Sequence, residues 1–305
     1  MPALGLALAF VLADASSTLI AAATSSPRPP ECASAAAAQE PEFWARARSA
    51  DRAPYCVALA RAHTRLGRLP AEALTLAERA QDLGCPRRGH ELLRARALVR
   101  LGRGSEAWTL LGPLLGKPGE PALIEDPVAL RDIAAAAVAA GDDGAAHDLF
   151  RVIAARANLL PDARLRAVVF LETGVLAMAR GQGSLPEAEL YFDEARRAQV
   201  PGLRDLIQAF TALALDRAGH GEQARAAARE TGGPWELERR AESLRDLVLP
   251  SGELSAAIAI LAEGRDQKLA DSRWRAYLAD ARAARGPWAE HAQRKLSAPA
   301  RGRAR

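Results

Sequence analysis

The chain has 305 residues, the length of about two average domains or of one elongated repeat array. Hydrophobic residues make up 49% of it, but aromatic residues only 5%, and alanine is the most frequent residue type. Because alanine has the highest helix propensity and a low strand propensity, this composition argues against a β-sandwich or β-barrel and favours an all-α fold. The formal net charge of +4 at pH 7 is small for this length, so it does not indicate a nucleic-acid partner.

The N-terminus carries an apolar run over residues 3–12, the size of the hydrophobic region of a signal peptide. Ten residues span about 15 Å as a helix, too little to cross a hydrocarbon core of about 30 Å. Small residues at 13–15 and 21–23 offer cleavage sites, although no Lys or Arg precedes the run. We expect residues 1–23 to be a signal peptide and the protein to be exported (periplasmic or extracellular), with no membrane span. A cytoplasmic protein with an apolar N-terminus is the alternative.

The cysteines and histidines show no metal-binding spacing. We therefore expect no metal site and no cofactor. Under export, we expect a disulfide between Cys56, near the start of one helix, and Cys85, just past the end of the next, because these ends share one pole of a helical hairpin. A pairing of Cys32 with Cys56, or three reduced thiols, are the alternatives. No GxSxG, HExxH or Walker A motif occurs, so we expect no catalytic residues and no enzyme activity.

Glycine and proline divide the chain into successive helices. Residues 24–52 are a Ser- and Pro-rich linker followed by an N-terminal helical segment. No later segment alternates β-branched residues with a period of two, so we expect no strands. Prolines stand where a first helical turn tolerates them, and glycines stand where helices end. The prolines are Pro54, Pro70, Pro161, Pro186, Pro201, Pro234 and Pro287, and the glycines are Gly67, Gly84, Gly102, Gly141, Gly181 and Gly219.

Internal similarity recurs along the chain. A glycine is followed four to six residues later by an alanine, and the residues four and seven positions after that alanine are mostly apolar or small. The alanines are Ala73, Ala107, Ala146, Ala188, Ala224 and Ala256, separated by 34, 39, 42, 36 and 32 residues. In a helical hairpin the small residue lets the second helix approach the first, while a larger residue at the +4 position fills the space to the next repeat.

This pattern resembles the tetratricopeptide repeat (TPR) family of 34-residue helix–turn–helix units. The resembling residues are Ala73/Ala77/Ala80, Ala107/Leu111/Leu114, Ala146/Phe150/Ile153 and Ala188/Phe192/Ala195. The resemblance covers residues 54–264. It departs from the family at the aromatic positions of the first helix, which hold Val57, Glu91, Leu130, Phe170 and Gln208. It implies a right-handed α-solenoid of TPR-like helix-turn-helix repeats over residues 53–265.

The segment after the array holds two amphipathic stretches, residues 272–285 and 288–296. We expect residues 266–298 to form C-terminal capping helices, because a solenoid needs a terminal cap with one polar face. Residues 299–305 are expected to be a disordered basic tail. Trp235 and Trp288 each follow a Gly-Pro pair, and both are interpreted as core anchors.

The resemblance also implies a concave groove, lined by the first helix of each repeat, that commonly binds a peptide. It places Arg65, Arg96, Arg100, Arg131 and Arg217 near this groove. A planar guanidinium suits bidentate recognition of a carboxylate. The Lys/Asn set of the chaperone-binding carboxylate clamp does not occur, so that activity is not implied.

We therefore expect a non-catalytic protein–protein interaction scaffold that binds a protein or peptide partner in its concave groove. The alternative is a cytoplasmic Arg-rich helical-repeat protein that binds nucleic acid. The small net charge and the acidic residues interleaved on nearly every helix stand against that alternative. An enzyme ranks third.

Overall fold

The computed structural model describes residues 54–85, 87–115, 126–240 and 247–297. Every regular element within these ranges is an α-helix or a 3-10 helix, and none of these residues belongs to a strand. The prediction of an all-α fold is therefore confirmed for this part of the chain. The predicted signal peptide (1–23), the linker (24–52) and the basic tail (299–305) lie outside the described residues. The chain divides into two compact units, the first ending at Ala140 and the second beginning at Gly141.

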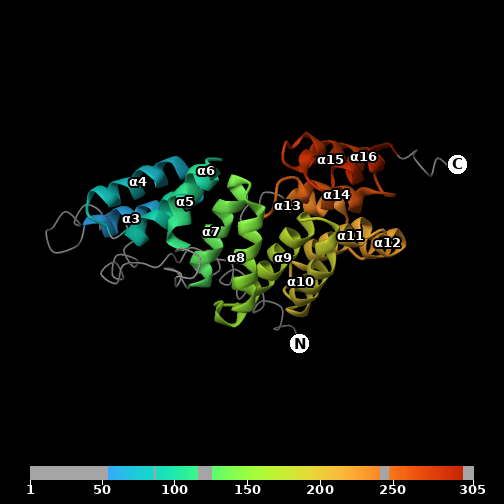
Figure 1. Cartoon of the computed structure of the whole chain (residues 1–305), viewed down its shortest axis with the longest axis horizontal. Helices are drawn as coiled ribbons and strands as arrows, with labels where there is room; N and C mark the ends of the chain where they lie inside the picture. The colour runs from blue at the N-terminus through green and yellow to red at the C-terminus, as the bar shows by residue number, and fades with distance from the viewer. Residues whose placement is uncertain (1–53, 86, 116–125, 241–246, 298–305) are drawn as a thin grey trace, which may run out of the picture. The chain divides into compact units, whose positions relative to one another are not determined.

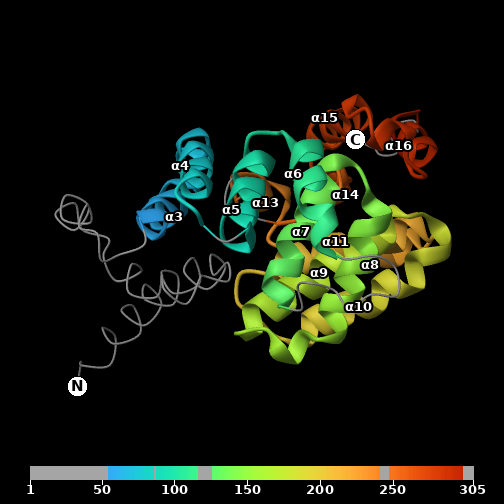
Figure 2. The same cartoon turned by 60° about the vertical axis from the view of Figure 1, so that its left-hand side comes forward.

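The first unit is a succession of helices in which each packs against the next along the chain. Figures 1 and 2 both show α3 beside α4. The helices are α3 (Pro54–Arg65), α4 (Pro70–Asp82), α5 (Arg87–Arg100), α6 (Gly104–Leu111) and α7 (Pro127–Ala140), with the short 3-10 helix η2 (Gly112–Leu115) after α6. Short turns join α3 to α4 and α5 to α6, so each of these pairs forms a helical hairpin.

In the second unit α9 packs on α10, α11 on α12, and α14 on α15. Its helices are α8 (Asp143–Ala155), α9 (Ala163–Ala179), α10 (Leu185–Arg197), α11 (Arg204–Arg217), α12 (Gly221–Arg229), α13 (Pro234–Arg240), α14 (Glu253–Ala262), α15 (Gln267–Ala279) and α16 (Ala289–Ser297). Three 3-10 helices, η3 (Ala157–Leu159), η4 (Gln182–Ser184) and η5 (Ala283–Arg285), lie in its connections.

Glycine and proline set the ends of these helices largely as predicted. Five of the expected glycines have φ between +74° and +114°, a region that residues with a Cβ atom rarely adopt. They are Gly84, Gly102, Gly141, Gly181 and Gly219. Pro54, Pro70 and Pro234 are the first residues of α3, α4 and α13. A missing amide proton costs nothing at that position, because a first-turn N–H has no partner within the helix.

The repeated alanines are buried, as their predicted role in close packing requires. Each is at most 3% exposed, and the set comprises Ala73, Ala107, Ala146, Ala188, Ala224 and Ala256. A close approach occurs between α9 and α10. A Cβ atom added to Gly174 would lie 2.5 Å from the Phe192 ring and 3.1 Å from the carbonyl oxygen of Ala188. Small residues on both helices thus allow this hairpin to close.

The C-terminal segment reaches back into the core of the second unit instead of covering only its last repeat. The indole N–H of Trp288 donates to the carbonyl oxygen of Met178 in α9, at 2.7 Å. The ammonium group of Lys295 in α16 donates to Asp216 in α11, also at 2.7 Å. In an array where repeats touch only their neighbours, contacts over such sequence separations would not form. The segment predicted as a cap is therefore part of the unit's core.

The two tryptophans that follow Gly-Pro pairs have different environments. Trp288 is 6% exposed, which confirms its predicted role as a core anchor. Trp235 is 55% exposed, so the same prediction was wrong for this residue. In α13 the inward position is taken by Leu237, which is 3% exposed. Two residues along a helix correspond to a rotation of about 200°, so Trp235 points the opposite way.

We expect Gly174→Ala to destabilise the second unit by up to about 2 kcal/mol, and by about 1–3 kcal/mol relative to a substitution that gains helix propensity without overpacking. Overpacking against the Phe192 ring costs about 1–3 kcal/mol, of which the better helix propensity of alanine returns about 1 kcal/mol. Gly144→Ala in α8 is the matched control, since the added Cβ would lie 3.7 Å from Asp142 Oδ1, an ordinary contact. Urea unfolding of both variants provides the measurement. A Gly174→Ala protein as stable as the control would refute the close approach.

Candidate functional site

The arginines predicted for the groove fall in different units of the structure. Arg65, Arg96, Arg100 and Arg131 belong to the first unit and Arg217 to the second. Arg65 ends α3 and is half exposed, with its Nε atom 3.5 Å from Glu72 Oε1. Arg100 is exposed at the end of α5, and Arg131 is half-buried in α7. Among these four, Arg96 has a largely buried side chain that pairs with an acidic residue.

Arg96 joins two helices of the first unit. Its Nη2 atom lies 2.5 Å from Asp132 Oδ2 in α7, and the two side chains are 9% and 12% exposed. Burial raises the pKa of the Asp132 carboxyl, and the positive charge of Arg96 lowers it in part. The guanidinium of Arg96 thus ties α5 to α7, which leaves little of it for the partner contact that was predicted.

Arg217 does not lie on an exposed surface, so its predicted place in the groove is corrected. Its side chain is fully buried, and its guanidinium donates two hydrogen bonds to Glu253, at 2.7 and 3.1 Å. The guanidinium also stands 4.8 Å from the centre of the Trp288 ring and 5.9 Å from that of Tyr277. Arg217 is the last residue of α11, and the rings of Trp288 and Tyr277, which come from later segments of the chain, cover that end of the helix.

The backbone at the start of α14 is shaped to make this burial possible. Gly252 precedes Glu253 and has φ +83°. A Cβ atom here would lie 2.8 Å from the Tyr277 ring and 2.9 Å from Ala283. Glycine therefore lets α15 and η5 close over the ion pair. Burial, together with the charge of Glu253, raises the pKa of Tyr277, so this phenol stays protonated.

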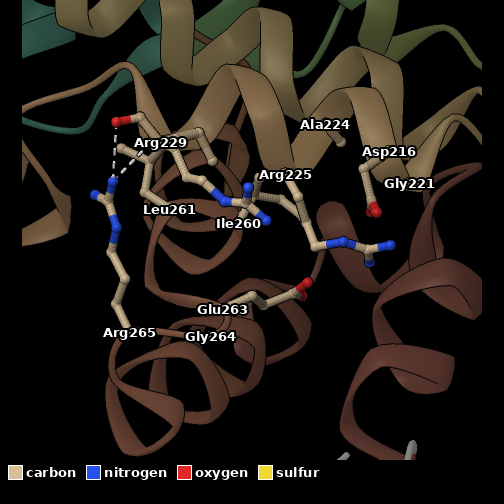
Figure 3. A pocket seen from close by; sticks show the side chains of 11 residues that line it. Asp216, Gly221, Ala224, Arg225, Arg229, Ile260, Leu261, Glu263, Gly264 and Arg265 are labelled. Atoms are coloured by element: carbon tan, nitrogen blue, oxygen red, sulfur yellow. Dashed lines mark hydrogen bonds between the residues drawn. The ribbon is translucent and has the colours of Figure 1, made fainter.

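A trough runs along α12 and the C-terminal half of α14, and Figure 3 shows it from close by. We call it the α12–α14 trough. Its volume is about 150 Å³. Its floor is apolar and consists of Ala224, Ala228, Ile260 and Leu261, all buried. Its rim is charged and consists of Asp216, Arg225, Arg229, Glu263 and Arg265. The trough thus combines a small apolar surface with several ionised groups, which is the composition of a ligand site.

The two carboxylates of the rim are paired or hydrogen-bonded from within the unit. Lys295 places its ammonium 2.7 Å from Asp216 Oδ1 and 2.9 Å from Glu263 Oε2. His291 Nε2 lies 2.8 Å from Asp216 Oδ2, and the indole of Trp274 donates to Glu263 Oε1 at 3.0 Å. Burial raises the pKa of Asp216, but the hydrogen bonds from His291 and Lys295 outweigh it and lower the pKa below its usual value. Asp216 is therefore ionised and already paired.

The arginines of the rim form fewer ion pairs with the rest of the unit than the carboxylates do. Arg225 bonds only the exposed Glu222, one helical turn earlier, at 2.6 Å. Arg265 donates to the carbonyl oxygens of Ala228 and Arg229, which end α12, as the dashed lines in Figure 3 show. Arg229 has no ion pair or side-chain hydrogen bond with any residue in the described ranges. The charge that the trough can offer to a ligand is therefore positive.

Sequence reasoning missed this trough because it assigned binding to the first helix of each repeat. Arg225 and Arg229 lie in α12, which is a second helix. One signal was present in the repeat alignment. The +4 position holds phenylalanine in the two preceding second helices, as Phe150 and Phe192, but alanine in α12, as Ala228. A small residue where the two preceding second helices carry a ring is consistent with a hollow at this position.

A second charged cluster surrounds His147 of α8. The His147 side chain is 3% exposed, and its Nδ1 lies 2.9 Å from Arg180 Nη1. Because a guanidinium only donates, this Nδ1 accepts and carries no proton. The other ring nitrogen lies 3.4 Å from Glu187 Oε1. Burial lowers the pKa of His147, although the charge of Glu187 raises it in part. Asp148 and Arg151 complete the charges around the ring.

Other predicted features are only partly covered by the structure. Cys85 is buried, but the side chain of Cys56 lies outside the described residues, so their disulfide remains a prediction. Within the described ranges, no group of three or more His, Cys, Asp or Glu side chains is placed to hold a metal ion. No helix in those ranges is long and apolar enough to span a bilayer.

The chain was compared with protein-family models, curated proteins and solved structures, and none of them matches it. Its function must therefore be argued from the geometry of the trough and of the helices around it.

We expect Glu253→Ala to destabilise the second unit by about 3–5 kcal/mol, because it leaves the charge of Arg217 buried without a counter-ion. Glu222→Ala removes the partner of the exposed Arg225, so this control should change stability little. The double substitution Arg217→Met with Glu253→Leu should recover most of the loss. Denaturant unfolding measures all three. An unchanged midpoint for Glu253→Ala would show that the pair does not hold the unit together.

We expect the second unit to lose stability as the pH falls below about 6.5, the ordinary pKa of histidine. The folded-state pKa of His147 is lowered, so below that pH the unfolded chain binds a proton that the folded chain does not. The stabilisation is complete above pH 6.5 and is lost toward the folded-state pKa.

The variant His147→Gln should remove this part of the pH dependence, whereas His220→Gln, at an exposed site, should retain it. Urea unfolding between about pH 5 and 8 tests the difference. Identical pH profiles for His147→Gln and the wild type would contradict the assignment.

Proposed function

We propose that this protein is a non-catalytic interaction scaffold that binds an acidic segment of a protein partner at the α12–α14 trough. The observation that carries the proposal is the charge at the rim. Its two carboxylates are paired with Lys295, while Arg229 has no partner in the described part of the chain and Arg225 has only an exposed one. Guanidinium groups in this state suit carboxylates, with which they form two parallel hydrogen bonds.

The packing of the helices supports a scaffold of the TPR-like kind. Packed helical hairpins, such as α3 with α4 and α9 with α10, and buried alanines at the repeated positions are the features from which such arrays are built. The proposal moves the binding surface from the first helices, where sequence reasoning expected it, to a second helix, α12. We retain the proposal that the array is TPR-like and propose no role for Arg217 in binding, because its guanidinium is buried.

The dimensions of the trough favour a segment of a partner over a large cofactor. Sites for drug-sized ligands and cofactors usually enclose about 300–1,000 Å³. The trough has about 150 Å³, so it accommodates one side chain of a bound segment at a time. The remaining affinity would come from contacts of the segment with neighbouring surface, as in other peptide-binding modules.

Export is part of the proposal and rests on the apolar run of residues 3–12 and on the cleavage sites that follow it. The partner would then be a periplasmic or extracellular protein. A mature N-terminus near Ser16 or Thr24 in native material would support export, and an intact Met1 would place the protein in the cytoplasm.

We expect a fluorescently labelled peptide rich in Asp and Glu to bind, and Arg225→Gln and Arg229→Gln each to weaken binding about tenfold. Arg197→Gln in α10 is the matched control, because Arg197 is also exposed and also pairs with a glutamate one turn earlier. Fluorescence anisotropy at two salt concentrations is the measurement. Equal losses for all three variants would indicate nonspecific charge attraction. Tight, steeply salt-dependent binding of RNA would instead favour the nucleic-acid alternative.

A further inference from the structure

We propose that the α12–α14 trough is a defined pocket for a single organic carboxylate whose apolar body has about the size of a benzene ring. The inference rests on the proposed function, because it assigns the same arginines the same anionic chemistry. It goes further in naming the size and shape of the group that is bound.

The trough lies where the +4 residue of a second helix is smaller than in the three preceding second helices. At the +4 position, α6, α8 and α10 carry Leu111, Phe150 and Phe192, each fully buried. The Phe192 ring stacks on Phe210 of the following helix, with ring centres 6.4 Å apart. The corresponding residue of α12 is Ala228, which lines the trough. A methyl group in place of a ring leaves a hollow between α12 and α14.

The volume of the hollow sets the size of its ligand. The trough measures about 150 Å³. An engineered apolar cavity of about 150 Å³ in another protein binds benzene, so one six-membered ring or a short branched chain fills such a space. The buried floor presents the hydrocarbon side chains of Ala224, Ala228, Ile260 and Leu261 to this body. A nucleotide or a larger cofactor exceeds it.

The rim sets the charge of the ligand. Asp216 and Glu263 are held by Lys295, so they repel an anion less than free carboxylates would. Figure 3 shows Arg225 and Arg229 extending from α12 toward the side of the trough where Glu263 lies. A carboxylate attached to the apolar body would meet the guanidinium of Arg229, which has no other partner in the ranges that the structure covers, and form charge-assisted hydrogen bonds with it.

The test adds benzoate or hexanoate to the full chain and monitors binding through chemical shift changes in two-dimensional NMR spectra. Both should bind saturably, and benzamide, which has the ring without the charge, should bind at least tenfold more weakly. Ala228→Phe supplies the missing ring from the chain itself and should abolish binding while leaving the helical circular dichroism unchanged. Arg229→Gln should weaken binding about tenfold, and Arg197→Gln should not change it.

Several results would overturn the inference: no saturable binding of either probe, equal binding of benzamide, or undiminished binding by a folded Ala228→Phe protein. If Ala228→Phe fails to fold, Arg229→Gln and benzamide still decide the charge requirement. The proposed function is tested separately. Acidic peptide that binds without competition from benzoate would preserve the scaffold proposal and refute the pocket, whereas benzoate binding without any peptide binding would do the reverse.

The bound carboxylate can belong to a free organic acid or to the last residue of a partner chain. A hexapeptide ending in leucine, as the free acid and as the amide, separates these sources. Binding of the free acid in preference to the amide, at higher affinity than hexanoate, assigns the pocket to a chain end. Binding of benzoate and hexanoate, with neither peptide binding, assigns it to a free acid.

Discussion

The burial of one ion pair constrains the whole second unit. Placing Arg217 and Glu253 in a protein core costs several kcal/mol for each charge unless geometry and neighbouring groups compensate. The pair meets that condition with two parallel hydrogen bonds and with the ring of Trp288 beneath the guanidinium. Because Trp288 is itself anchored to Met178, the pair can be closed only when α9, α11, α14 and the C-terminal segment are all in place.

The packing of the C-terminal segment against the second unit also determines the charge of the trough. Lys295 and His291 come from α16 and contact the carboxylates of the trough: Lys295 pairs with both Asp216 and Glu263, and His291 contacts Asp216. Without α16, the carboxylates of Asp216 and Glu263 would lie in the trough without Lys295, and they would compete with a ligand for the arginines of α12. With α16 docked, the arginines keep their charge for a ligand. The C-terminal segment therefore acts on the trough as well as on the stability of the unit.

Buried ion pairs recur in both units with different consequences. Arg96 and Asp132 join α5 to α7 in the first unit, and Arg217 and Glu253 join α11 to α14 in the second. Both arginines were expected at a partner-binding surface, because each lies in a first helix of a hairpin. Position along the helix was predictable from the repeat. The contact of each guanidinium with an acidic residue of a later helix was not predictable. Asp132 lies 36 residues after Arg96, and Glu253 lies 36 residues after Arg217.

The sequence by itself determined the helical class, the helix-ending glycines and the buried alanines, because these depend on local conformational preference and on a short packing period. It also contained the change from Phe192 to Ala228 that opens the trough. Only the tertiary structure decided that Trp235 is exposed, that Arg217 is buried, and that Arg229 keeps no partner in the described residues. Those outcomes depend on contacts between residues up to 110 positions apart, as from Trp288 to Met178. A local pattern carries no information on such contacts.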